Sequence, residues 1–256
     1  MGLTFHERVG LDERRISPFS WRIRYALAHK GLDPDVIPTR FADVARIRGL
    51  SGQDLVPIIE DGGRVVHDSW AIACHLEDRF PDRPSLFGGP AGLGAARLVN
   101  IWSDTVLNPA MRRVISADFI WCIEPGDRAY FRRSREAQFG MTLEEYCADR
   151  DRALPDFLAA CAPLERTLSE QSFIAGAAPA YVDYVVFSVF QWARIGSPRD
   201  VLGDTGAPMA GTINTTAMRA WRARMVALYG GLGDRFAGYP SDRSGTDGRA
   251  TQQPGA

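Results

Sequence analysis

The sequence lacks any pair of closely spaced cysteines. Its cysteines are Cys74, Cys122, Cys147 and Cys161, which stand far apart with no C-x-x-C motif. Neither they nor the histidines have the spacing of a zinc ligand set. The chain therefore predicts reduced, structural cysteines, as in the cytoplasm, and no metal site.

Long apolar segments and an excess of one charge are also missing. No run approaches the ~20 apolar residues needed to cross a bilayer, and the first residues lack the apolar core of a signal peptide. Basic residues number 30 against 31 acidic ones, a net charge of −1. The 45% apolar share is that of a globular protein. We expect a cytoplasmic protein with no membrane or nucleic-acid partner.

Two motifs of common enzyme classes are absent as well. The segments Gly92-Leu93-Gly94 and Gly231-Leu232-Gly233 lack the third glycine of a dinucleotide-binding loop, and neither follows a predicted strand. No G-x-S-x-G turn is present to expose a nucleophilic serine. The absence of these motifs argues against a dinucleotide-binding loop and against a nucleophilic serine.

The first part of the chain has the pattern of a small α/β domain. Its order is βαβ-α-ββα, with predicted strands at 3–7, 35–38, 55–60 and 64–67, and predicted helices at 17–30, 40–53 (irregular) and 68–80. Pro57 is unusual because proline removes a ladder hydrogen bond, so it belongs at a strand start, where a cis peptide bond is possible.

The remainder of the chain predicts only helices. Amphipathic segments cover 95–111, 113–121, 127–140, 142–168 and 180–194, with a bend or end expected at Pro109. The predicted division is a domain at 1–88, a linker at 89–94, a helical domain at 95–236 and a disordered tail at 237–256. The arginine-rich segment Arg128–Arg135 is interpreted as a solvated, salt-bridged helix.

The segment Ile16–Arg22 suggests an anion site. Ser17 is a favoured helix N-cap and Pro18 suits the first helical position. This places a hydroxyl beside unpaired N–H groups at the positive end of a helix, where an anion such as a thiolate is stabilised. Taken alone, the segment favours a serine that only caps its helix.

Three motifs in this order resemble glutathione transferases. They are Ser17-Pro18-Phe19 at the first helix, Val56-Pro57 before a strand, and Asp68-Ser69 at a helix start, followed by Arg83-Pro84-Ser85-Leu86-Phe87 before the linker. Ile16–Arg22, Asp68-Ser69-Trp70 and Arg128–Glu136 are similar to bacterial lignin β-aryl etherases and the related fungal, FuA-type transferases. The family implies a thioredoxin-like N-terminal domain followed by an all-α domain.

The resemblance assigns roles to residues of this chain. Ser17 would donate a hydrogen bond to the glutathione thiolate, and the residues that would hold glutathione are Phe19, Gln53, Val56, Pro57, Asp68 and Ser69. A subset of the aromatic residues of the helical domain would line an apolar pocket for an aromatic second substrate. The candidates are Trp102, Phe119, Trp121, Phe139 and Trp192, and Ser20 would be an accessory hydrogen-bond donor. A homodimer is also implied. The alternatives are a glutathione-dependent isomerase or peroxidase, and a non-catalytic protein that binds aromatic ligands.

One position departs from the family pattern. The last apolar helix of these enzymes usually has Ser, Thr or Asn as its N-cap and Asp three residues later. This chain has Ala180 and Asp183 at those positions. The aspartate is retained and the capping hydroxyl is lost, a change that costs ~1 kcal/mol of stability.

Overall fold

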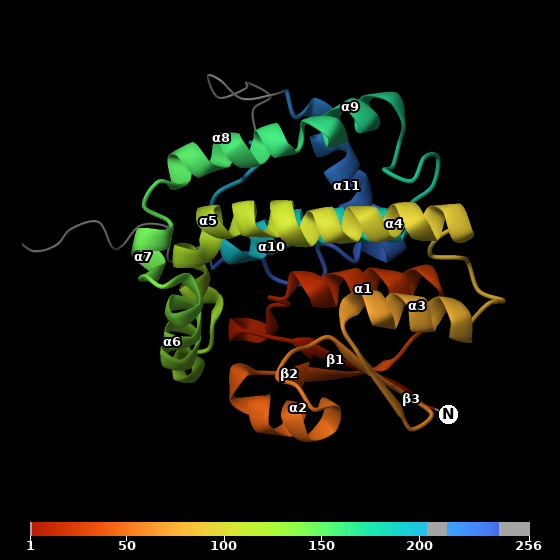
Figure 1. The fold of residues 1–256 in the computed structure, drawn as a ribbon, viewed down its shortest axis with the longest axis horizontal. Coiled ribbons are helices and arrows are strands. Elements are labelled where there is room, and N and C mark those ends of the chain that lie inside the picture. Colours follow the sequence, from red (N-terminus) through yellow and green to blue (C-terminus); the bar gives the residue numbers. More distant parts are fainter. Residues whose placement is uncertain (1, 204–213, 241–256) are drawn as a thin grey trace, which may run out of the picture.

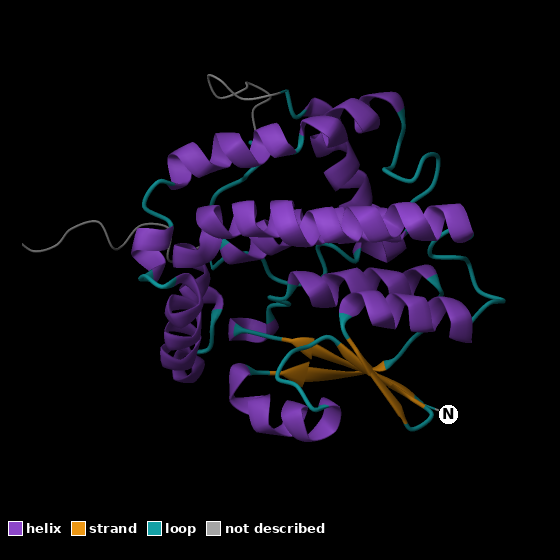
Figure 2. Ribbon diagram, in the orientation of Figure 1, coloured by secondary structure: helices purple, strands orange, loops and turns teal. Residues whose placement is uncertain are grey.

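The protein is described by a computed structural model over residues 2–203 and 214–240. Its only sheet in those residues has the order β2-β1-β3-β4. The strands are β1 (Leu3–Arg8), β2 (Asp35–Thr39), β3 (Ile58–Asp61) and β4 (Arg64–His67). β1 pairs in parallel with β2 and antiparallel with β3, which pairs antiparallel with β4 (Figure 2). The predicted βαβ unit and hairpin are confirmed.

Helices cover both faces of this sheet. α1 (Pro18–His29) and α3 (Ser69–Arg79) lie on the face toward the helical part, and α2 (Val44–Ser51) lies on the other face (Figure 1). Successive strand residues point to opposite faces. Ile59 therefore joins the main core, whereas its neighbour Ile58 packs with Ile47 of α2.

The rest of the described chain is helical, as the sequence predicts. The helices are α4 (Pro90–Trp102), α5 (Asn108–Phe119), α6 (Arg128–Phe139), α7 (Leu143–Tyr146), α8 (Arg150–Ala160), α9 (Ala162–Glu170), α10 (Tyr181–Gly196) and α11 (Thr216–Gly231). α10 is buried along nearly its whole length and packs against α1, which joins the two parts. No helix of the described ranges is long and apolar enough to cross a membrane.

The segment between the two parts differs from the prediction. The sequence predicts a linker over 89–94, but α4 already begins at Pro90. One glycine of this segment has a packing role, because a Cβ on Gly92 would lie 1.8 Å from the carbonyl oxygen of Phe87. A π-helical turn (Ser103–Leu107) then separates α4 from α5, whose first turn holds Pro109. The backbone angles are helical on both sides of the π turn, so the predicted interruption takes the form of this turn and not of a helix end at Pro109.

Two further predictions need correction. The helix predicted over 142–168 is divided into α7, α8 and α9, with breaks after Tyr146 and at Cys161. The tail predicted to be disordered over 237–256 is partly ordered: Gly238 accepts a hydrogen bond from Arg14, and Tyr239 donates its backbone N–H to Arg194. Residues 241–256 lie outside the described part of the chain.

Candidate functional site

Ser17 stands at the N-terminus of α1 with its hydroxyl available. It has extended backbone angles, and its Oγ accepts a hydrogen bond from the backbone N–H of Ser20 at 3.2 Å. The hydroxyl hydrogen donates to no residue within the described ranges, and Ser17 is only partly buried. Ser17 is therefore a capping residue that still has a donor to offer.

Ser20 has a different environment. Its side chain is 1% exposed, and its Oγ has no hydrogen-bond partner among the residues that the structure describes. It does not line the cavity next to Ser17. The expectation that Ser20 is an accessory donor at the site is therefore not supported by its position.

The Val56–Pro57 peptide bond is cis, as the sequence suggested was possible. Val56 precedes β3, and its backbone N–H and carbonyl pair with no group in the described part of the chain. The Gln53 side chain holds the preceding loop, because its Nε2 donates to the carbonyl of Leu55 at 2.8 Å. Gln53 thus braces the Val56 backbone, which is free to pair with a peptide-like ligand.

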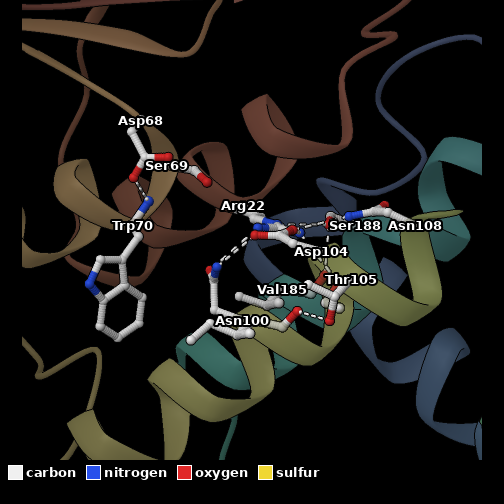
Figure 3. Close-up of polar contacts among 12 residues, drawn as sticks. Arg22, Asp68, Ser69, Trp70, Asn100, Asp104, Thr105, Asn108, Val185 and Ser188 are labelled. Atoms are coloured by element: carbon white, nitrogen blue, oxygen red, sulfur yellow. Dashed lines mark hydrogen bonds and ion pairs between the residues drawn. The ribbon is translucent and has the colours of Figure 1, made fainter. Parts of the chain in front are cut away.

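Asp68 and Ser69 form the start of α3. The Asp68 carboxylate accepts hydrogen bonds from the backbone N–H groups of Trp70 and Ala71, both at 3.0 Å (Figure 3 draws the first). Asp68 has a positive φ of 72°, and Ser69 is 3% exposed. The carbonyl of Ser69 accepts a hydrogen bond from Tyr181 of α10 at 3.1 Å. This helix terminus is thereby fixed to the helical part.

A cavity of about 250 Å³ lies between the α/β part and the helical part. The predicted site residues that line it are Ser17, Phe19, Val56, Phe119, Phe139 and Trp192. Those that do not line it are Ser20, Gln53, Pro57, Asp68, Ser69, Trp102 and Trp121. Trp102 instead packs against the core, and the Arg128 guanidinium lies over the Trp121 ring at 5.1 Å. Both tryptophans therefore lie outside the subset of aromatic residues that lines this cavity.

Sequence reasoning missed several lining residues. They are Arg8, Ile16, Pro18, Phe41, Leu55, Asn108, Arg112, Ser116, Phe131, Arg135 and Gln138. One signal was available: Phe131, Arg135 and Phe139 are spaced by four residues and therefore share one face of α6. The solvated helix predicted for this segment is correct only for its outer side, where Arg132 pairs with Glu136 and Glu144.

The polar environment of this cavity is cationic. Burial lowers the pKa of Arg8 to about 10, which still means a charged side chain near neutral pH. Burial and the neighbouring Arg112 also lower the pKa of Arg135. No group of His, Cys, Asp and Glu in the described ranges has the arrangement of a metal site.

A buried ion pair connects the start of α1 to α4 and α10. The Arg22 side chain is fully buried, and its Nη2 lies 2.6 Å from Oδ1 of Asp104. It also donates to Asn100 at 3.3 Å and Ser188 at 3.4 Å (Figure 3). The Phe19 ring lies against the same guanidinium, 4.7 Å from its centre. The helix that presents Ser17 is therefore held in place by both parts of the molecule.

Comparison with known proteins identifies the family. Residues 16–79 match the N-terminal domain of glutathione S-transferases, and residues 95–203 match the C-terminal domain. The chain belongs to the glutathione S-transferase family. Glutathione S-transferase Z1 of Arabidopsis thaliana is 36% identical over 87 residues, which are 31% of this chain and 38% of that protein. The match thus spans well under half the length of this relative.

Solved structures share the whole fold. A glutathione S-transferase of Ceriporiopsis subvermispora in complex with glutathione has a TM-score of 0.73 at 22% identity, over 90% of this chain and 96% of the other. Glutathione transferase GSTFuA2 of Phanerochaete chrysosporium has a TM-score of 0.65 at 26% identity, over 91% of this chain and 94% of the other. The β-etherase LigF of Sphingobium sp. strain SYK-6 has a TM-score of 0.63 at 19% identity, over 91% of this chain and 98% of the other. The suggested resemblance to FuA-type transferases and to a bacterial β-etherase is confirmed at the level of the fold.

Proposed function

We propose that this protein is a glutathione transferase in which Ser17 stabilises the glutathione thiolate for attack on an aromatic electrophile. The observation that carries the proposal is the position of Ser17: it caps α1, has a free donor, and faces a cavity with aromatic walls. A free thiol has a pKa of about 8.5, and a helix N-terminus with a hydroxyl donor lowers it.

Glutathione would extend from Ser17 along the α/β part. The unpaired backbone groups of Val56 suit the cysteinyl residue of the tripeptide, and the N-terminus of α3 at Asp68–Ser69 suits its γ-glutamyl end. The glutathione complex of the Ceriporiopsis relative supports this ligand. The aromatic substrate would occupy the cavity beside Ser17.

The reaction balances without a further cofactor. The thiol proton is released to solvent, the sulfur forms a bond to an electrophilic carbon, and the leaving group departs with the electron pair of the broken bond. In β-aryl ether cleavage the leaving group is an aryloxide. We propose this reaction as one to test, because the fold is similar to that of the β-etherase LigF.

The experiment compares Ser17→Ala with Ser20→Ala in turnover of aryl halides and β-aryl ether model compounds. Losing one hydrogen-bond donor to a developing or stabilised anion lowers kcat by about 100-fold. We expect that loss for Ser17→Ala, with the KM for glutathione changed by less than about twofold. Ser20→Ala is the matched control and keeps full turnover. Equal turnover of Ser17→Ala and wild type would remove Ser17 from the mechanism.

We also propose that the protein is a homodimer that uses α4 as its contact face. Exposed apolar side chains gather on α4 and the π turn after it: Leu93, Leu98, Ile101 and Val106. Leu98 is 70% exposed. Light scattering should give twice the chain mass of 28.2 kDa for wild type and a single chain for Leu98→Glu/Ile101→Glu. A wild-type protein of 28.2 kDa would contradict the dimer.

A further inference from the structure

The cavity beside Ser17 contains three arginines, one from each of three elements. Arg8 comes from the end of β1, Arg112 from α5 and Arg135 from α6, and we call them the cavity arginines. Within residues 2–203 and 214–240, none of them forms an ion pair with a carboxylate. Arg132, one turn from Arg135 on the same helix, pairs with two glutamates. The described residues that line the cavity include no aspartate or glutamate, so its wall supplies no counter-charge for the three arginines.

The carboxylates closest to Arg8 are engaged elsewhere. Asp43 accepts a hydrogen bond from the backbone N–H of Arg40 at 2.7 Å, and Asp127 accepts one from Phe41 at 3.2 Å. Both raise the pKa of Arg8 through their charge, but burial outweighs them. Partly desolvated cations that contact no anion favour the binding of an anionic ligand.

Each cavity arginine also lies beside an aromatic ring. The guanidinium carbon is 4.7 Å from the Phe41 ring centre for Arg8, and 5.3 Å from that of Phe131 for Arg135. For Arg112 the distance to the Phe139 ring centre is 6.0 Å. Stacking on a ring limits the orientations of a guanidinium. Arg8 already donates to the backbone carbonyls of Arg40 and Asp54, and Arg135 donates to the Ser134 hydroxyl at 3.2 Å. Arg112 donates to none of the described residues, so its N–H edges are available for bidentate contact with a carboxylate.

An unpartnered acceptor completes the polar lining. Asn108 is 2% exposed and its Nδ2 donates to Asp104 at 3.2 Å, while its Oδ1 has no partner among the described residues. Asn108 lines the cavity, so its side chain adds an uncharged polar group to the wall. The cavity is thus equipped for a ligand with both aromatic and polar ends.

We propose that the second substrate is an aromatic anion. Its carboxylate pairs with the cavity arginines, and its ring lies among Trp192 and the phenylalanines that line the cavity. This inference rests on the proposed glutathione transfer. With an activated aryl chloride, the thiolate sulfur bonds to the ring carbon, chloride departs with the bonding electrons, and the thiol proton goes to solvent. The charged group holds the ring near Ser17 without taking part in these steps.

The first test uses a matched pair of substrates, 4-chloro-3-nitrobenzoate and 4-chloro-3-nitrobenzamide. Each kcat/KM is divided by the rate of the uncatalysed reaction with glutathione, which removes the difference in ring reactivity. We expect wild type to prefer the carboxylate by at least about tenfold, because a desolvated charge pair contributes this much or more. Arg112→Gln and Arg135→Gln should each abolish most of that preference, because they lower the rate with the benzoate more than the rate with the benzamide.

Three controls make the outcome specific. Arg132→Gln removes a cation from the outer side of α6 and should keep the wild-type preference. Arg135→Lys keeps the charge and should recover part of it. Circular dichroism checks that each variant is folded. Equal normalised rates for the two substrates in wild type would overturn the proposal. So would a tenfold rise in the KM for glutathione with the preference unchanged, since the arginines would then bind glutathione.

A binding measurement separates this inference from the proposed function. Calorimetry with S-methylglutathione present, which has no nucleophilic thiol, compares the Kd values of the benzoate and the benzamide. If no substrate turns over but the benzoate still binds at least about tenfold more tightly in wild type than in Arg135→Gln, the transferase proposal fails and the anion site stands. Equal binding of the two compounds overturns the anion site alone.

Discussion

At the scale of single residues, Arg22 shows how a buried charge is accommodated near the site. Its guanidinium is completely enclosed, yet Asp104 supplies a counter-charge and the side chains of Asn100, Ser103 and Ser188 accept its remaining hydrogen bonds. A paired and hydrogen-bonded charge is tolerated in a core, whereas a broken pair is costly. Arg22 therefore ties α1 to the helical part and indirectly orients Ser17.

Replacement of this arginine should lower stability. We expect Arg22→Met to reduce the free energy of unfolding by about 3 kcal/mol, because several buried acceptors lose their donor. Arg22→Lys retains the charge but not the fork of donors, and should lose less. Urea unfolding at equilibrium measures both. A loss below about 0.5 kcal/mol for Arg22→Met would show that the network contributes little.

Individual site residues were predictable where the signal is local. Ser17 and Asp68 were identified because a helix cap depends on a few consecutive residues, and the structure shows both as caps. The sequence could not separate Trp102 and Trp121 from the aromatic residues that line the cavity, because helical spacing does not reveal which side of a helix faces a cavity. The sequence near Arg8 gave no signal for its position in the cavity, because that position depends on α5 and α6, which begin at Asn108 and Arg128.

At the scale of elements, a carboxylate joins α3 to the chain that leads into α4. Glu77 of α3 lies 2.8 Å from the ammonium of Lys30 and accepts hydrogen bonds from the Ser85 hydroxyl and the Leu86 backbone. Partial burial alone would raise the pKa of Glu77, but these bonds outweigh it and hold the pKa below its usual value. The contact therefore depends on the charged form.

This contact should be lost in acid. A carboxyl with a lowered folded-state pKa contributes stability above its unfolded pKa of about 4.3, and loses it as the pH falls through the folded value. Glu77→Gln should cost about 1 kcal/mol at pH 7, and the difference from wild type should shrink below about pH 4. Unfolding curves across this range measure it. A difference that is constant with pH would contradict the assignment.

Elements were predictable when their ends are defined by the sequence nearby. α1 and the β3–β4 hairpin appear where capping and turn residues placed them. α10 begins after Ala180 without a capping hydroxyl, and Asp183 compensates by accepting hydrogen bonds from Ile174, Ala175 and Ala180. The early start of α4 and the breaks among α7, α8 and α9 depend on packing between distant segments, which periodicity does not report.

At the scale of the whole molecule, the candidate site belongs to neither part alone. The α/β part supplies Ser17 and Val56, while α5, α6 and α10 supply the opposite wall with Phe119, Phe139 and Trp192. The order of elements and the fold class were predictable from the sequence. The composition of the cavity was not, because it depends on how the two parts pack together.

The most direct test of the central claim is the pKa of glutathione bound to the protein. Thiolate absorbance in the ultraviolet, followed against pH, measures it in wild type and in Ser17→Ala. We predict a bound thiol pKa at least one unit below the free value of about 8.5 in wild type, and a return toward that value in Ser17→Ala. The same lowered pKa in both proteins would contradict the assignment of Ser17 as the residue that stabilises the thiolate.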